Sequence, residues 1–167
     1  HTFHLSNGPV SSMALSADGK HLLVASAGKK PSIHLHTISN RSTLAVWSPS
    51  GPVRAIAAHP HEARFAVAIA APDSPHIGQM DLSGYPRIYP SPQLLELPSA
   101  PLSLSYTPDG AHLFVGTVDS LEVYADSRSF AEFKGEHGRA SAIGFSTDGT
   151  TTLLGRTDGS ILGIQTS

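Results

Sequence analysis

The sequence of 167 residues contains no cysteine, little charge and no long apolar run. The absence of cysteine excludes disulfides, zinc–thiolate sites and thiol nucleophiles. Charged residues make up 14% of the chain and the net charge is −2 with histidine neutral, which excludes the basic surface of a nucleic-acid-binding protein. No apolar run is long enough to cross a bilayer, so we expect no membrane partner. The chain begins at His1 without a signal-peptide pattern, which indicates a processed chain or a segment of a longer one.

Helical periodicity is also missing from any stretch longer than about ten residues. Apolar runs of about four to eight residues, bounded by Gly, Pro, Asp and Ser, follow one another along the chain instead. Fifteen glycines and thirteen prolines are spread between these runs as turn residues. The pattern predicts an all-β protein.

One phrase recurs four times along the chain. Clear copies occupy residues 14–24, 105–115 and 144–154, and a degenerate copy occupies residues 57–67. Each copy is an apolar stretch, a polar turn and a second apolar stretch. Repeats of about forty residues built from short strands predict an array of units that cannot bury their faces alone.

Each repeat divides into four expected strands. The first unit has strands at 10–15, 21–26, 32–37 and 43–47, and the second at 53–58, 65–69, 77–82 and 94–97. The third has strands at 102–106, 112–116, 121–124 and 129–133, and the fourth at 141–145, 152–155 and 160–164. The units therefore span about 8–47, 51–97, 100–133 and 138–167, and the last one lacks its fourth strand.

The strand missing from the last unit has a candidate at the start of the chain. Residues 2–10 have the same layout as residues 44–53, which join the fourth strand of one unit to the first strand of the next. A sheet edge is a liability unless it is paired. We therefore predict that Thr2, Phe3, His4 and Leu5 form an interacting strand that completes the last unit.

The repeats resemble the blades of β-propellers, and most closely WD40 repeats. Residues 133–149 resemble the Gly-His element of that family, its first strand and its Asp-Gly turn, and residues 157–161 resemble the next tight turn. Val123-Tyr124-Ala125-Asp126 stands where the family usually has Trp-Asp. Residues 101–115 are also similar to the repeats of lactonase-like and surface-layer propellers. The resemblance implies a β-propeller of four-stranded antiparallel blades, with four blades in this chain.

Four blades leave the closure of the propeller open, because propellers have about four to eight blades. Two chains can form one eight-bladed ring in which each first strand completes a sheet of the partner. Alternatively, another protein or further sequence completes a larger propeller, or the four blades close alone. We favour completion by another protein or by further sequence, because the sequence begins without methionine. Unclosed blade faces would leave apolar surface in water, which normally indicates a partner.

Ten histidines offer the only candidate metal ligands. His34 and His36 lie on one face of an expected strand, and His59 and His61 form a second pair. No acidic cluster marks a third or fourth ligand, so we interpret these histidines as polar strand and turn positions and expect no metal and no cofactor.

Four Asp-Gly pairs have the composition that tight turns require. They are Asp18-Gly19, Asp109-Gly110, Asp148-Gly149 and Asp158-Gly159. Because the motif repeats, we interpret these residues as turn-forming and not as catalytic acids or bases, and we expect a positive φ at Gly149.

Residues 85–92 form an insertion rich in tyrosine and proline between two expected strands. Binding residues concentrate in long loops, so Tyr85, Arg87 and Tyr89 are candidate interaction residues, although a linker stiffened by proline accounts for the same composition. The resemblance favours a non-enzymatic protein–protein interaction scaffold that pairs with a protein partner or a second copy. The alternative is a lactonase-like or other hydrolytic propeller enzyme with its site at the central channel.

Overall fold

The computed structural model describes residues 8–82, 95–125, 128–134 and 139–165. Within these ranges the chain forms fifteen β-strands and no helix. No described helix is therefore available to cross a membrane. The strands build four antiparallel sheets in which each strand pairs with its neighbour in the chain. We call these sheets blades 1 to 4.

The strands of the four blades follow the chain in order. Blade 1 contains β1 (Val10–Leu15), β2 (His21–Ser26), β3 (Ser32–Thr37) and β4 (Thr43–Trp47), and blade 2 contains β5 (Val53–Ala58), β6 (Arg64–Ile69), β7 (His76–Asp81) and β8 (Leu95–Glu96). Blade 3 contains β9 (Pro101–Tyr106), β10 (Leu113–Thr117), β11 (Ser120–Ala125) and β12 (Arg128–Lys134), and blade 4 contains β13 (Ala140–Phe145), β14 (Thr151–Arg156) and β15 (Ile161–Gln165).

The all-β architecture of four-stranded antiparallel blades that the sequence predicts is confirmed. Each of the fifteen expected strands from residue 10 onward is present within one residue of its expected ends. Blade 4 has three strands among the described residues, with β15 at its outer edge. The strand expected at residues 2–6 lies outside the described residues.

All four blades share one irregularity in their first strand. The pairing between the first and second strands shifts after Val10, Val53, Pro101 and Ala140, and two residues later it resumes at Ser12, Ala55, Ser103 and Ala142. These last four residues pair with Ala25, Ala68, Gly116 and Gly155. The common β-bulge therefore aligns the blades residue by residue.

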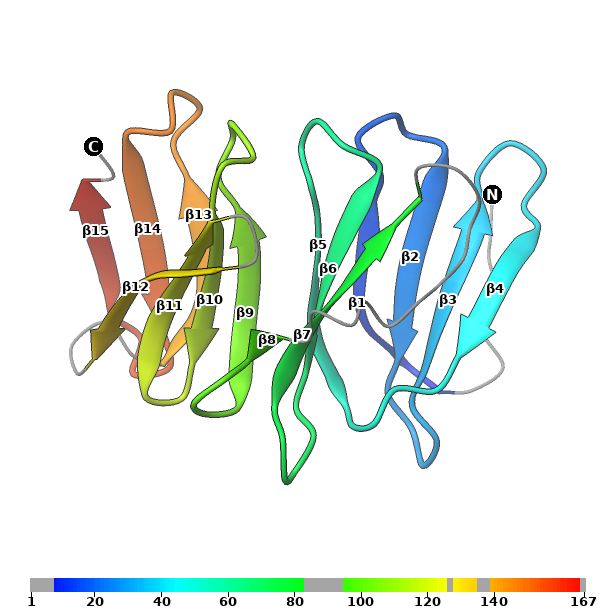
Figure 1. Cartoon of the computed structure of the whole chain (residues 1–167), viewed down its shortest axis with the longest axis horizontal. Helices are drawn as coiled ribbons and strands as arrows, with labels where there is room; N and C mark the ends of the chain where they lie inside the picture. The colour runs from blue at the N-terminus through cyan, green and yellow to red at the C-terminus, as the bar shows by residue number, and fades with distance from the viewer. Residues whose placement is uncertain (1–7, 83–94, 126–127, 135–138, 166–167) are drawn as a thin grey trace.

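The blades stand side by side in one row, with blade 1 and blade 4 at opposite ends (Figure 1). Their first strands lie innermost, since β1 contacts β5, β5 contacts β9 and β9 contacts β13. No comparable contact joins any described strand of blade 4 to blade 1. The described residues thus form an open arc, and the four blades do not close on themselves.

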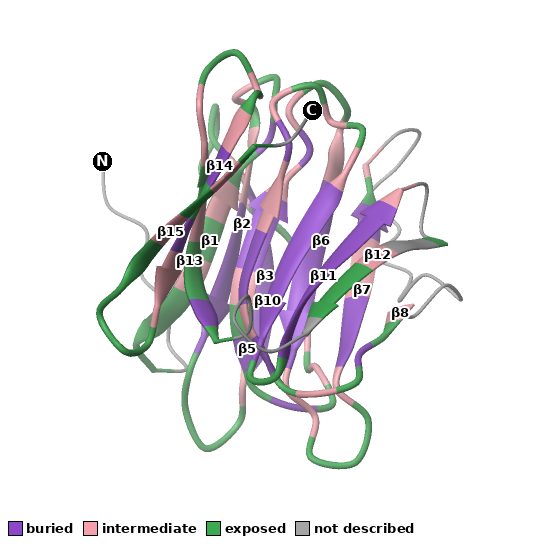
Figure 2. Cartoon of the chain, turned by 90° about the vertical axis from the view of Figure 1, so that its left-hand side faces the viewer, coloured by how far each residue is buried: buried purple, intermediate pink, exposed green. Residues whose placement is uncertain are grey.

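Each blade has two faces, which we name by the direction of the chain. The forward face lies toward the next blade and the backward face toward the preceding one. Three apolar cores fill the spaces between successive blades. The buried strands in the middle of the arc contrast with the exposed strands of blade 4 (Figure 2).

Polar and aromatic contacts fix the same interfaces. The Ser12 hydroxyl of blade 1 accepts a hydrogen bond from the Ile56 amide of blade 2 at 2.9 Å. The Phe114 ring of blade 3 meets Phe145 of blade 4 edge to face, with ring centroids 5.2 Å apart. Successive blades are therefore held in one register by both burial and hydrogen bonding.

Candidate interaction surfaces

The turns between the first two strands of blades 1, 3 and 4 are closed by an aspartate. In blade 4 the Asp148 carboxylate accepts hydrogen bonds from the Ser146 hydroxyl at 2.5 Å and from the Thr150 amide at 3.1 Å. Asp18 and Asp109 accept the corresponding bonds in blades 1 and 3. These aspartates therefore satisfy backbone amides of their own turns, which is the turn-forming role that the sequence predicts for them.

Asp158 closes the turn between β14 and β15 by accepting bonds from the Ser160 hydroxyl at 2.6 Å and the Ser160 amide at 2.9 Å. Hydroxyl and amide donors favour a charged carboxylate, so they lower the pKa of Asp18, Asp109, Asp148 and Asp158. The folded state gains from these bonds above about pH 4 and loses that gain as the pH falls through the lowered pKa values.

The glycine of each Asp-Gly pair has a positive φ, namely Gly19 (68°), Gly110 (76°), Gly149 (72°) and Gly159 (87°). At Gly149 a Cβ atom would meet only the Pro108 Cδ, at 3.9 Å, so backbone conformation alone restricts this position.

We expect Gly149→Val to lower the free energy of unfolding by about 2 kcal/mol, because side chains with a branched Cβ avoid this conformation. Urea denaturation measures the loss. Gly149→Asn is the matched control, since asparagine adopts positive φ at lower cost; equal midpoints for the two variants would contradict the explanation.

Blade 2 builds its equivalent turn on a histidine. His59 Nδ1 accepts hydrogen bonds from the amides of His61 at 3.2 Å and Glu62 at 3.0 Å. Since Nδ1 accepts, the ring proton is on Nε2, which donates to the Gly110 carbonyl at 3.1 Å. His61 Nε2 lies 3.0 Å from the Pro108 carbonyl. The histidine pair therefore ties the turn of blade 2 to the turn of blade 3.

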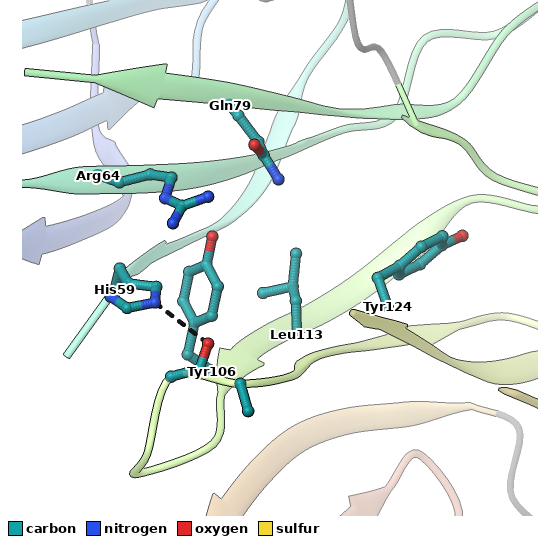
Figure 3. Close-up of a pocket in the computed structure, with 8 residues that line it drawn as sticks. His59, Arg64, Gln79, Tyr106, Leu113 and Tyr124 are labelled. Carbon is teal, nitrogen blue, oxygen red and sulfur yellow. Dashed lines mark hydrogen bonds between the residues drawn. The ribbon is translucent and has the colours of Figure 1, made fainter. Parts of the chain in front are cut away.

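A pocket of about 30 Å³ lies beside this histidine bridge, between blades 2 and 3 (Figure 3). Its lining includes His59, Arg64, Gln79, Tyr106, Leu113 and Tyr124. Burial raises the pKa of Tyr106 to about 12, so the phenol is neutral. The volume holds one or two water molecules. The pocket is therefore a small polar gap between blades.

His34 and His36 lie on the backward face of blade 1 with their rings stacked, the centroids 5.9 Å apart and the planes at 7°. Both residues are buried. The Ser32 hydroxyl lies 2.8 Å from His34 Nε2, and the Thr43 hydroxyl lies 3.1 Å from His36 Nδ1. Among the described residues, no group of three or more His, Cys, Asp or Glu is placed to hold a metal ion.

This histidine pair makes stability depend on pH. Burial lowers the pKa of His34, and burial together with His34 lowers that of His36. Between these lowered values and about pH 6.5 the unfolded chain binds more protons, so the free energy of unfolding falls as the pH drops. We expect His34→Gln/His36→Gln to flatten the slope of the free energy of unfolding between pH 7.5 and about 5.5. Denaturant titrations measure it, and the exposed His61→Gln is the control; an unchanged slope in the double variant would contradict the assignment.

The forward face of blade 4 corresponds to the faces that blades 1 to 3 bury against the next blade, but its apolar side chains are exposed. Ile161 pairs with Gly155 at the position that Ile33, Ile77 and Leu121 hold in blades 1 to 3. Those three side chains are fully buried, whereas Ile161 is 76% exposed. Leu153, which corresponds to the buried Phe114, is 48% exposed. We call Ala142, Gly144, Leu153, Gly155, Ile161 and Gly163 the forward end face.

The backward face of blade 1 carries exposed apolar side chains beside the buried His34 and His36. Met13 is 65% exposed, whereas its counterparts Ile56 and Leu104 in blades 2 and 3 are buried. Val10 and Leu15, on the same strand face, are also exposed. We call Val10, Met13, Leu15 and Val46 the backward end face. Terminal units of repeat proteins normally carry a polar outer side, and these two do not.

The interaction residues expected from the sequence are not placed by the structure. Thr2, Phe3, His4, Leu5, Tyr85, Arg87 and Tyr89 lie outside the described residues. The sequence pattern alone does not reveal the end faces, because their residues are as apolar as the buried residues at equivalent positions. The signal that identifies them is the alignment of the four blades, combined with their order in the arc.

Comparison with solved structures identifies the architecture as a β-propeller. The chain is similar to the β-propeller domain of Myceliophteria thermophila Cps50 (Swd1), at 20% identity and a TM-score of 0.73, over 93% of this chain and 51% of that one. It is also similar to Kuenenia stuttgartiensis hydrazine synthase, at 17% identity and a TM-score of 0.75, over 99% and 48%. A protein of unknown function from Desulfotomaculum acetoxidans matches at 11% identity and a TM-score of 0.77, over 97% and 57%.

These similarities show the fold alone, at the level of β-propeller blades. No family model and no curated protein matches the chain. The chain spans about half the length of the solved structures that it matches. An enzyme, hydrazine synthase, is among them, and a fold by itself does not determine function.

Proposed function

We propose that this chain is a WD40-like protein-interaction scaffold that joins further propeller blades through its two end faces. The observation that carries the proposal is the exposure of Ile161 at a position where three equivalent side chains are fully buried. Burying apolar surface is the main driving force of protein association. The end faces are therefore the surfaces on this arc with the most to gain from a partner.

The similarity to hydrazine synthase leaves an enzyme as the competing hypothesis, and the similarity to the Swd1 domain supports the propeller fold on which the scaffold proposal is built. An enzymatic site needs several polar groups that converge on a space large enough for a substrate. The polar pocket between blades 2 and 3 holds one or two waters, and the Asp-Gly aspartates bond to their own turns. The geometry of the described residues therefore favours the scaffold.

The sequence also supports a second mode of association. An added strand gains main-chain hydrogen bonds along a sheet edge, and β15 is the outer strand of blade 4 among the described residues. We propose that Thr2, Phe3, His4 and Leu5 supply such a strand. Tyr85, Arg87 and Tyr89 are proposed as further contacts of a protein partner.

Site-directed photo-crosslinking tests the scaffold function. A benzophenone side chain at Met13 or Leu153 is expected to crosslink the chain to one polypeptide in an extract of the source organism, and the product to disappear when unlabelled chain is added in excess. Lys20 is the control position, because its side chain is exposed in a turn and is not part of either end face. Equal crosslinking at Lys20, or no competable product at Met13 and Leu153, would contradict the proposal.

A further inference from the structure

We infer that the partner of the end faces is a second copy of this chain, and that two chains close into one eight-bladed ring. The inference rests on the proposed function, since it names the occupant of the same two surfaces. The forward end face of each copy packs on the backward end face of the other. The three internal blade interfaces of the chain are the template for this contact.

The two end faces are complementary because equivalent forward and backward faces pack on each other at three interfaces within the chain. In blades 1 to 3, forward-face residues such as Leu23, Ala66 and Phe114 are buried against the backward face of the next blade. Leu153 occupies the same position on blade 4, and Met13 occupies the position of Ile56 and Leu104. A second copy therefore presents each end face with the kind of surface that covers its internal equivalents.

The residues that define the two end faces are apolar, and the forward one is bordered on the same strand face by the uncharged Thr151 and Gln165. The forward end face contains only alanine, glycine, leucine and isoleucine, and the backward end face only valine, methionine and leucine. His34 and His36 are the ionisable side chains on the same strand faces of blade 1, and burial lowers their pKa so that they are neutral at pH 7. No buried charge therefore opposes the contact.

The four blades of this chain match about half of each solved propeller in the comparison. The solved propellers that it resembles are about twice as long as this chain, which covers 51% and 48% of two of them. A second copy would supply four further blades, as many as the first. A head-to-tail contact of this kind either closes into a ring or grows without limit, and an arc that spans half of a propeller closes after two copies.

Light scattering on a sizing column, over a range of protein concentrations, tests the ring. The unmodified chain is expected to have twice the mass of the 17.5 kDa chain. Met13→Asp on the backward end face and Leu153→Asp on the forward end face are each expected to weaken dimerisation about 100-fold or more, because each substitution damages both contacts of the ring. Ile38→Asp, at an exposed apolar residue outside both end faces, is the matched control and should leave the dimer intact. Circular dichroism melting confirms that each variant is folded.

Mixing the two end-face variants distinguishes a head-to-tail ring from other dimers. The mixture contains one undamaged contact, between the forward end face of Met13→Asp and the backward end face of Leu153→Asp. We therefore expect the mixture to associate more strongly than either variant alone. A dimer that persists in either variant alone would show that like faces pair, and would overturn the ring.

A well-folded monomer at all concentrations would also overturn the inference. The proposed scaffold function would still hold if the benzophenone at Met13 or Leu153 crosslinked the chain to a different polypeptide, and if excess unlabelled chain abolished that product. Failure of both experiments would remove both the second copy and the scaffold function.

Discussion

Replacing Gly116 with valine is expected to lower the free energy of unfolding by about 3 kcal/mol or more. Gly116 lies on β10, where blade 3 meets blade 4. A Cβ atom added there would overlap the carbonyl oxygen of Ala140 and come within 2.9 Å of the Ala140 Cβ. Neither obstacle is the end of a flexible side chain, so the two blades would have to separate. Thermal and urea denaturation measure the effect, which corresponds to a fall of roughly 10 °C in Tm for a domain of this size.

Gly155 provides the matched control, because it occupies the same position on β14 of blade 4. Gly155 pairs with Ala142 as Gly116 pairs with Ser103. A Cβ atom at Gly155 would meet the Ala142 Cβ at 3.4 Å, an ordinary contact within the same sheet. Gly155→Val should therefore stay within about 1 kcal/mol of the original chain. Equal losses at the two glycines would show that blade packing does not restrict Gly116.

The strands could be predicted closely from the sequence because several of them end at turns formed by specific residues. Asp148-Gly149 requires a turn, since the carboxylate accepts the turn's amide bonds and the glycine takes positive φ. Even the degenerate copy was recognised by its apolar flanks, and His59 proves to replace the aspartate as the acceptor in that turn. Local hydrogen bonding and alternating burial both depend on the residues of short stretches of the chain, so a local sequence pattern predicts them.

The end faces and the histidine bridge could not be predicted, because they depend on which blades are neighbours. His59 and the Gly110 carbonyl are 51 residues apart and meet only when blade 2 packs on blade 3. Ile161 and Ile77 look alike in the sequence, since each is an isoleucine at the start of a third strand. Such a residue is buried when another blade packs on it and exposed when none does. A local sequence pattern does not show which of the two applies.

The equivalent residues Ile77 and Ile161 are expected to differ strongly in their contribution to stability. Ile77→Ala is expected to lower the free energy of unfolding by about 2–5 kcal/mol, because Ile77 is fully buried between blades 2 and 3 and its truncation leaves a cavity. Ile161→Ala removes the same atoms from the equivalent position on blade 4, where the side chain is 76% exposed. Measured by urea denaturation under conditions in which the chain is monomeric, this variant should lose less than about 0.5 kcal/mol.

The same pair of variants reports on what covers blade 4 in solution. Under conditions in which the chain associates, truncating Ile161 removes apolar area from the contact, so the loss caused by Ile161→Ala should grow with protein concentration. The loss caused by Ile77→Ala should not change, because blade 3 of the same chain already covers that residue. A loss at Ile161 that is large at every concentration would mean that the forward face of blade 4 is covered within one chain, and would contradict the open arc.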